Sequence, residues 1–110
     1  RNLYDEQLKA IARKGGVVQV CIYDCFLRKE GGASIVDIIE HLHHMVNVMG
    51  IEHVGIGTDF DGDGGVKGCY DSSELINLTR RLLQERYSEK DIRLIWGENF
   101  LRVMRNNQAL

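Results

Sequence analysis

Two short apolar runs, separated by a long amphipathic segment, constrain the fold of this chain most strongly. The runs are VVQVCIY at residues 17–23 and HVGIG at residues 53–57. Both are too apolar and too rich in β-branched residues to be loops, so each predicts a buried strand. Between them, apolar side chains recur at helical spacing and predict a helix over residues 34–49, ended by Gly50. A strand–helix–strand order of this kind predicts a parallel β/α unit.

Helical patterns are predicted on both sides of this unit. Before the first strand, Asn2 or Asp5 can cap a helix that ends at the glycine pair 15–16. After the second strand we expect three helices, one from Ser72 or Ser73, one capped by Ser88 and broken at Gly97, and one from Glu98 to about Asn106. Residues 24–33 are expected to be a loop. The predicted order is α-β-α-β-α-α-α over a single unit, residues 1–110, and two strands alone are too few for a stable sheet. The pattern therefore predicts part of a larger α/β structure.

A glycine-rich acidic loop runs from the end of the second predicted strand to about residue 71. Asp59 stands where that strand should end, and Asp61 and Asp63 follow at alternate positions. In β/α enzymes, catalytic groups gather at the carboxyl ends of the strands, because loops and helix N-termini converge there on a pocket. The loop is therefore a candidate site, although aspartates in such a sequence also form simple polar turns.

The first specific alternative for this loop is calcium binding. The series from Asp59 to Gly64 fits the first six positions of an EF-hand loop. The twelfth position requires a bidentate glutamate, and counting from Asp59 reaches Tyr70 instead. The motif also requires a helix where residues 53–57 predict a strand. These two mismatches weaken the calcium interpretation, and a calcium-loop module is kept as an alternative because the first six positions match.

The second alternative is a phosphatase of the haloacid-dehalogenase type. A strand followed by D-x-D-G would present Asp59 as nucleophile and Asp61 as its acid–base partner, with Mg²⁺ on the phosphate. Such enzymes also need a downstream lysine and an acidic pair after a further strand. Beyond Asp71 the sequence predicts only helices, which weakens this alternative.

Charge and hydropathy exclude two classes of partner. The chain has 14 basic and 16 acidic residues, so its net charge of −2 gives no basic field that would favour nucleic acid. No apolar run approaches the about 18 residues of a membrane span, and no signal peptide is recognisable. The chain opens on Arg1 rather than Met, so we expect the natural N-terminus to be absent and predict no compartment. The three cysteines, Cys21, Cys25 and Cys69, form no disulfide or metal motif and are expected to be buried or half-buried apolar residues.

Three segments, in this order and spacing, carry a resemblance to a known family. They are RNLYDEQLKAIARKGGVVQV at residues 1–20, HVGIGTDFDG at 53–62 and LLQERYSEKDIRLIWGENFLRV at 82–103. Together they resemble the C-terminal part of the membrane dipeptidase (renal dipeptidase) family of zinc metallopeptidases. The resemblance implies an α/β fold, the C-terminal part of a (β/α)8 TIM-type barrel, and hydrolysis of dipeptides at a site with two zinc ions.

The resemblance also implies roles for individual residues. Asp59 matches the family's active-site aspartate, which handles the proton of the metal-activated water. Arg1 matches the arginine that binds the substrate's terminal carboxylate, while Tyr23 and Phe26 match or lie near positions in the substrate pocket. The metal ligands of the family have no counterpart in this chain, so no metal-binding residue is predicted within it. Cys21 departs from the family, which commonly has Asn there.

We therefore expect a segment of a dipeptidase that is inactive as the isolated chain. Its partners would be a dipeptide substrate and either the N-terminal remainder of the barrel or a second copy, because exposed strand edges seek partners. His41 and His44 lie one helical turn apart and could suggest a metal site, but on an outer barrel helix they are expected to be surface residues. The competing class is a non-enzymatic protein, either a cation-binding loop or an assembly module.

Overall fold

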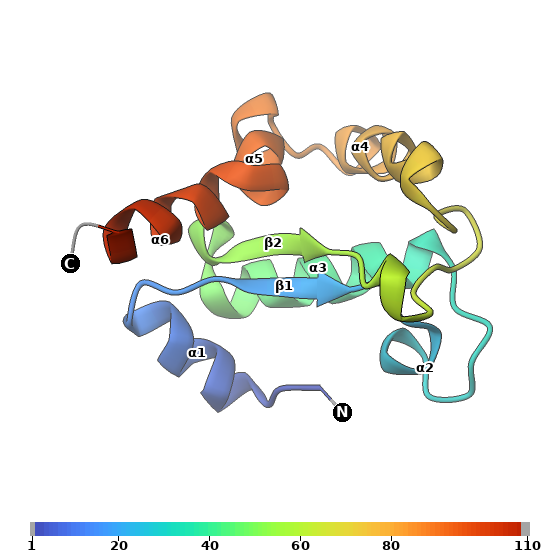
Figure 1. Cartoon of the computed structure of the whole chain (residues 1–110), viewed down its shortest axis with the longest axis horizontal. Coiled ribbons are helices and arrows are strands. Elements are labelled where there is room, and N and C mark those ends of the chain that lie inside the picture. Colours follow the sequence, from blue (N-terminus) through green and yellow to red (C-terminus); the bar gives the residue numbers. More distant parts are fainter. Residues whose placement is uncertain (1, 109–110) are drawn as a thin grey trace.

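The computed structural model describes residues 2–108, which form helices around a small parallel sheet (Figure 1). The helices and strands are α1 (Asp5–Arg13), β1 (Val18–Cys21), α2 (Asp24–Leu27), α3 (Ile35–Met49), β2 (Val54–Gly57), α4 (Leu75–Gln84), α5 (Glu89–Arg93) and α6 (Asn99–Gln108). Short 3₁₀ turns precede and follow β2, and a π-helical turn, η4 (Leu94–Glu98), joins α5 to α6.

The two strands are parallel neighbours, and α3 is the crossover between them. Val18 pairs with Val54 and Cys21 with Gly57, which sets the register over four residues of each strand. In Figure 1, α3 lies behind the sheet, α1 lies beside β1, and α5 and α6 lie on the side of β2. This arrangement confirms the α/β fold and the strand–helix–strand unit that the apolar pattern predicts.

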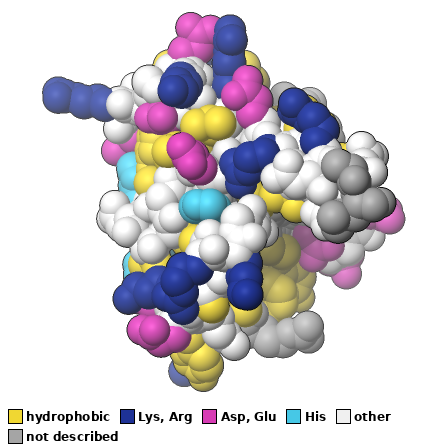
Figure 2. Space-filling view, turned by 90° about the vertical axis from the view of Figure 1, so that its left-hand side faces the viewer, with side chains coloured by type: hydrophobic (Ala, Val, Ile, Leu, Met, Phe, Trp, Pro, Cys, Tyr) yellow, Lys and Arg dark blue, Asp and Glu magenta, His cyan; other side chains and the backbone are white. Residues whose placement is uncertain are grey.

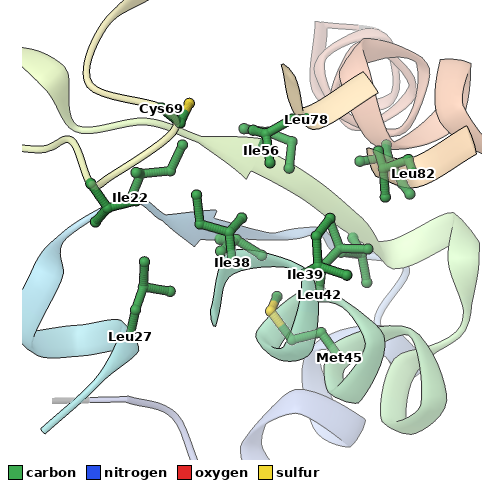
Figure 3. Close-up of a cluster of buried hydrophobic side chains, with 14 of the residues drawn as sticks. Ile22, Leu27, Ile38, Ile39, Leu42, Met45, Ile56, Cys69, Leu78 and Leu82 are labelled. Atoms are coloured by element: carbon green, nitrogen blue, oxygen red, sulfur yellow. The ribbon is translucent and has the colours of Figure 1, made fainter. Parts of the chain in front are cut away.

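The core forms where α3 packs against one face of the sheet (Figure 3). Successive strand residues point to opposite faces, and most of those directed toward α3 are buried, with Val18 half-buried. The buried apolar residues of the strands and of α3 are Val20, Ile22, Val54, Ile56, Ile38, Ile39, Leu42, Met45 and Met49. Leu78 and Leu82 of α4 join the same cluster. The helical spacing read from residues 34–49 therefore predicted the buried face correctly.

The segment after β1 differs from the predicted loop, because residues Asp24–Leu27 form the short helix α2. The carbonyl of Tyr23 accepts hydrogen bonds from the amides of Phe26 and Leu27, at 3.0 and 3.1 Å. Leu27 is buried in the core, which fixes this turn in place. The observed order is consequently α-β-α-α-β-α-α-α. A single helical turn is too short for periodicity to detect.

The predicted break at Gly97 is also wrong. The chain stays helical from Glu89 to Gln108, because the amide of Asn99 donates to the carbonyl of Leu94 and so closes a π-helical turn. A glycine costs about 1 kcal/mol in a helix relative to alanine. Burial of Ile95 and Asn99 within this stretch offsets that cost.

The end of the molecule at which the strands begin is mostly polar. Figure 2 shows charged and other polar side chains over much of this face, with an apolar strip at its lower right. On α6, Phe100, Leu101 and Met104 stay exposed. Within residues 2–108, no helix combines the length and the apolar character that crossing a membrane would require.

Asn99 is the buried polar residue that ties α6 to the start of β2. Its side chain is wholly inaccessible, and its amide nitrogen donates to the carbonyls of Ile51 and Val54, at 2.7 and 2.9 Å. Buried carbonyl groups that lose their donors are costly. One side chain therefore satisfies backbone groups at the point where the helical C-terminal segment meets the sheet.

We expect Asn99→Ala to lower the free energy of unfolding by about 2 kcal/mol or more, since the buried carbonyl of Val54 and the partly buried carbonyl of Ile51 lose a donor. Asn106→Ala is the matched control, because Asn106 lies exposed on the same helix and gains the same helix propensity. Urea unfolding of both variants measures the difference. Equal stability of the two would contradict the structural role of Asn99.

Candidate active site

The candidate site lies where the two strands end. Tyr23 follows the end of β1 by two residues, and Asp59 follows the end of β2 by two residues. Because paired strands end side by side, the register brings the two chain segments together, and the amide of Ile22 donates to the carbonyl of Thr58 at 3.2 Å. Residues that are 36 positions apart in the sequence therefore share one edge of the sheet.

Asp59 occupies a constrained backbone conformation. Its φ and ψ of 64° and 27° are left-handed, which aspartate tolerates better than most residues. Its carbonyl accepts hydrogen bonds from the amides of Gly62 and Gly64, at 2.9 and 2.8 Å. A Cβ placed on Gly62 would lie 2.5 Å from Oδ1 of Asp59. The loop thus closes around Asp59, while its side chain stays exposed at the strand end.

Cys21 contacts Asp59 from the neighbouring strand. Its Sγ lies 3.6 Å from Oδ2 of Asp59, and the thiol donates to the carboxylate. Burial raises the pKa of the Cys21 thiol, and the charge of Asp59 and this hydrogen bond raise it further. The thiol therefore keeps its proton at neutral pH and remains a donor.

The rest of the acidic loop is anchored to both strands and to α3. The amide of Gly65 donates to the carbonyl of Ile22 at 2.7 Å, so the loop crosses over the end of β1. The amide of Ile35 donates to the carbonyl of Lys67 at 3.0 Å, which ties the loop to the start of α3. Val66 and Cys69 are buried in the core. The loop is consequently a packed element rather than a loose turn.

Tyr23 and Phe26 lie together at the end of β1. Their ring centroids are 4.8 Å apart with planes tilted by 59°, and both side chains are half-buried. The side-chain amide of Asn2 donates to the carbonyl of Phe26 at 2.7 Å. The structure therefore brings these two predicted residues together, whereas the predicted Arg1 lies outside the described residues.

Asp24 was not singled out from the sequence, and it organises the loop after α2. Its carboxylate accepts hydrogen bonds from the amides of Gly32 and Ala33, at 3.1 and 2.6 Å. Gly31 and Gly32 both have positive φ, which makes this tight return of the chain possible. The sequence signal that could have identified this role is an aspartate just after the predicted strand, with the glycine pair 31–32 later in the same loop.

Asp61 and Asp63 do not form a cation cage with Asp59. Both are exposed, and Asp63 also has a left-handed backbone. Across residues 2–108, no three side chains of His, Cys, Asp or Glu gather where they could hold one metal ion. Asp71 caps the 3₁₀ turn at residues Ser72–Glu74, because its carboxylate accepts hydrogen bonds from the hydroxyl and the amide of Ser73, and these bonds lower the pKa of the carboxyl group. Asp61 thus lies within the short 3₁₀ turn after β2, and Asp63 directly after it.

The histidines of α3 contact neighbouring helices and loops. His41 bonds the carbonyl of Leu27 at 2.9 Å, and His44 lies 2.7 Å from the carboxylate of Asp5. His44 is exposed, as expected, whereas His41 is half-buried and not a surface residue. His43 is also half-buried and is stacked on Tyr87, with a 2.7 Å hydrogen bond between them. The spacing of His41 and His44 by one helical turn therefore serves contacts between α3 and its neighbours.

A cavity of about 310 Å³ opens beside β1, between α1, α2 and α3. Its walls are mostly apolar, and Cys21 and Phe26 contribute to them. The residues around it are Asn2, Leu3, Leu8, Val18, Gln19, Val20, Cys21, Phe26, Leu27, His41, His44 and Met45. Asp59 is not among them, so this cavity does not contain the carboxylate of the candidate site.

Comparison with known proteins decides the family. The sequence profile of the membrane dipeptidase family, peptidase family M19, matches residues 1–110. The chain belongs to this family. The resemblance carried by the three segments is therefore confirmed, and this family is one of dipeptidases rather than of EF-hand proteins or phosphatases.

Curated relatives support the same assignment. An uncharacterized dipeptidase of Schizosaccharomyces pombe is 38% identical over 100% of this chain, which covers 27% of that protein. The dipeptidase aclJ of Aspergillus oryzae is 34% identical over 94% of this chain, and the match covers 25% of that protein. The chain thus spans about a quarter of the length of these two relatives.

Solved structures show that the fold is shared. The probable dipeptidase PvdM from Pseudomonas aeruginosa superposes with a TM-score of 0.88 at 27% identity, over 93% of this chain and 40% of PvdM. A metallopeptidase from Rhodobacter sphaeroides, liganded with a phosphinate mimic of the dipeptide L-Ala-D-Ala, gives 0.85 at 33% identity over 91% of this chain and 30% of its own. The two strands and their helices therefore correspond to part of a dipeptidase fold of the TIM-barrel type.

Gly64 should be the most restrictive position of the loop. A Cβ there would overlap the carbonyl oxygens of both Thr58 and Asp59. We expect Gly64→Ala to lower the free energy of unfolding by about 2 kcal/mol or more, because the backbone at Asp59 must move.

Gly97→Ala provides the control for this substitution, since a Cβ at Gly97 meets no atom within 4 Å and the position is helical. That variant should be neutral or slightly stabilising. Thermal unfolding of the two variants measures the contrast. A Gly64→Ala protein as stable as Gly97→Ala would show that the loop does not constrain Asp59.

Proposed function

We propose that this chain is the C-terminal segment of a zinc-dependent dipeptidase, in which Asp59 is the acid–base residue. The observation that carries the proposal is the placement of Asp59 at the carboxyl end of β2, exposed and held by the loop that follows. In barrel enzymes the reacting groups occupy this end of the strands. Family membership supplies the reaction class, which is hydrolysis of a dipeptide.

We place the ligands of the metal ions mainly in other parts of the protein. The described residues do not group three His, Cys, Asp or Glu side chains at one point, so they do not fit a complete zinc site. In metallopeptidases the metal polarises the scissile carbonyl and lowers the pKa of the attacking water. We assign two zinc ions to the complete site, with ligands outside this chain.

Within this chain, the carboxylate of Asp59 is the group suited to move a proton. An ionised carboxylate at the strand end can accept a proton from the attacking water and return it to the leaving amine. The exposure of Asp59 allows contact with a substrate, and its left-handed backbone holds the carboxylate at the strand end. Asp24, by contrast, is already engaged by the amides of Gly32 and Ala33.

Tyr23 and Phe26 form the proposed aromatic wall for the substrate. They lie at the end of β1, next to the strand that ends at Asp59, and contact each other. A tilted aromatic pair offers apolar area together with the Tyr23 hydroxyl. Arg1 is proposed to bind the substrate carboxylate, because a guanidinium group can form two parallel hydrogen bonds to it.

The active protein also requires the remainder of the barrel. Within residues 2–108 the sheet has two strands, too few to close a barrel. One sheet face carries Gln19 and Cys21 opposite Gly55 and Gly57, away from α3. We propose that this face lines the barrel interior, and that the isolated chain is inactive or associates with itself.

Asp59→Asn tests the assignment of the acid–base residue. In the intact protein, turnover of a dipeptide should fall by a factor of about 10² to 10⁴, because the amide cannot accept the proton. Asp63→Asn is the matched control, since Asp63 lies exposed in the same loop with the same left-handed backbone. Both variants should keep the zinc content and melting temperature. Wild-type turnover in Asp59→Asn would disprove the role.

Metal analysis tests the location of the zinc ligands. The isolated chain should retain no stoichiometric zinc after dialysis, and the complete protein should retain about two ions per site. Calcium titration of the isolated chain provides the complementary measurement. Tight calcium binding by this chain would favour a cation-binding loop module, and stoichiometric zinc in it would place the ligands among these residues.

A further inference from the structure

We propose that Cys21 is a positioning residue for the reaction, whose thiol holds the Asp59 carboxylate in the orientation needed for proton transfer. The inference rests on the proposed role of Asp59. Its basis is the contact between two strands, in which Sγ of Cys21 lies 3.6 Å from Oδ2 of Asp59. A thiol is a weak donor, and an ionised acceptor strengthens such a bond.

The sheet register explains why these two side chains meet. Cys21 pairs with Gly57, and Asp59 follows Gly57 by two residues, just beyond the end of β2. One residue beyond the strand ends, the amide of Ile22 donates to the carbonyl of Thr58 at 3.2 Å, which keeps the segments that carry the two side chains together. Gly57 has no side chain to intervene, and the left-handed backbone of Asp59 turns the chain at this point.

The carboxylate is confined from two sides. Oδ2 faces the thiol of Cys21, and Oδ1 faces Gly62, where an added Cβ would lie only 2.5 Å away. The carbonyl of Asp59 is held separately by the amides of Gly62 and Gly64. The backbone of Asp59 is thus fixed by the loop, and Cys21 supplies the side-chain hydrogen bond that selects one orientation of the carboxyl group.

The other two cysteines show that Cys21 is in a distinct environment. Cys69 is wholly buried in the core, where burial raises its pKa to about 11. Cys25 is exposed, contrary to the expectation of at least partial burial. Cys21 is half-buried at the candidate site and has a carboxylate as its partner.

The test compares a donor and a non-donor at position 21 in the intact, zinc-loaded enzyme. Cys21→Val removes the hydrogen bond and keeps a small apolar side chain, so kcat should fall about tenfold with KM unchanged. Cys21→Ser restores an O–H donor and should recover most of the loss. Cys25→Ser, a matched cysteine change at an exposed position, should leave kcat unchanged. Zinc content and melting temperature are measured for each variant.

The outcomes separate this inference from the proposed function. If Asp59→Asn abolishes turnover while Cys21→Val keeps wild-type kcat, the positioning role is wrong and the role of Asp59 stands. If Cys21→Ser loses as much activity as Cys21→Val, the thiol does not act as a donor and the inference is also wrong. If Asp59→Asn keeps turnover, the proposed acid–base role of Asp59 is wrong, and the positioning role of Cys21 is wrong with it. Should Cys21→Val not fold, Cys21→Ala replaces it in the same comparison.

Discussion

The packing of α3 against one face of the two-stranded sheet is the interaction on which the rest of this structure depends. Ile38 and Leu42 of α3 are wholly buried, as are Val54 of β2 and Ile22 directly after β1. Burying side chains of this size contributes about 1.5–3 kcal/mol each. This contact fixes which strand residues point toward the helix. The alternate residues, Cys21 among them, must then point to the opposite face, where the candidate site lies.

Much of this fold could be predicted from the sequence. The two strands were predicted from short apolar runs rich in β-branched residues, and α3 from its helical spacing, and all three elements carry buried residues. The short α2 and the π-helical turn at Leu94–Glu98 could not be predicted, because both depend on contacts made after folding. Leu27 is held by the core, and Asn99 by the carbonyls at the start of β2. The helix propensities of the local sequence give no information about either contact.

The location of the candidate site at the strand ends could be predicted from the sequence, but the contacts within it could not. The position of Asp59 at a strand end follows from the apolar run before it, and the structure brings Tyr23 and Phe26 together on the adjacent strand end. The contact of Cys21 with Asp59 depends on the register of the two strands, which no short motif encodes. The role of Asp24 depends on the glycine-containing loop after α2, which folds back and places the amides of Gly32 and Ala33 at its carboxylate. These contacts are therefore determined by pairing between residues far apart in the sequence, and composition and motif spacing do not predict them.

The anchoring of the acidic loop has a consequence for the motions of this segment. Its amides and carbonyls bond Ile22 at the end of β1 and Ile35 at the start of α3, and Val66 and Cys69 are part of the core. Opening this loop therefore requires breaking contacts of the sheet and of α3 together. Regions joined in this way open as one cooperative unit. The backbone of Asp59 should accordingly share the slow opening of the core, and not the fast fluctuations of an ordinary surface loop.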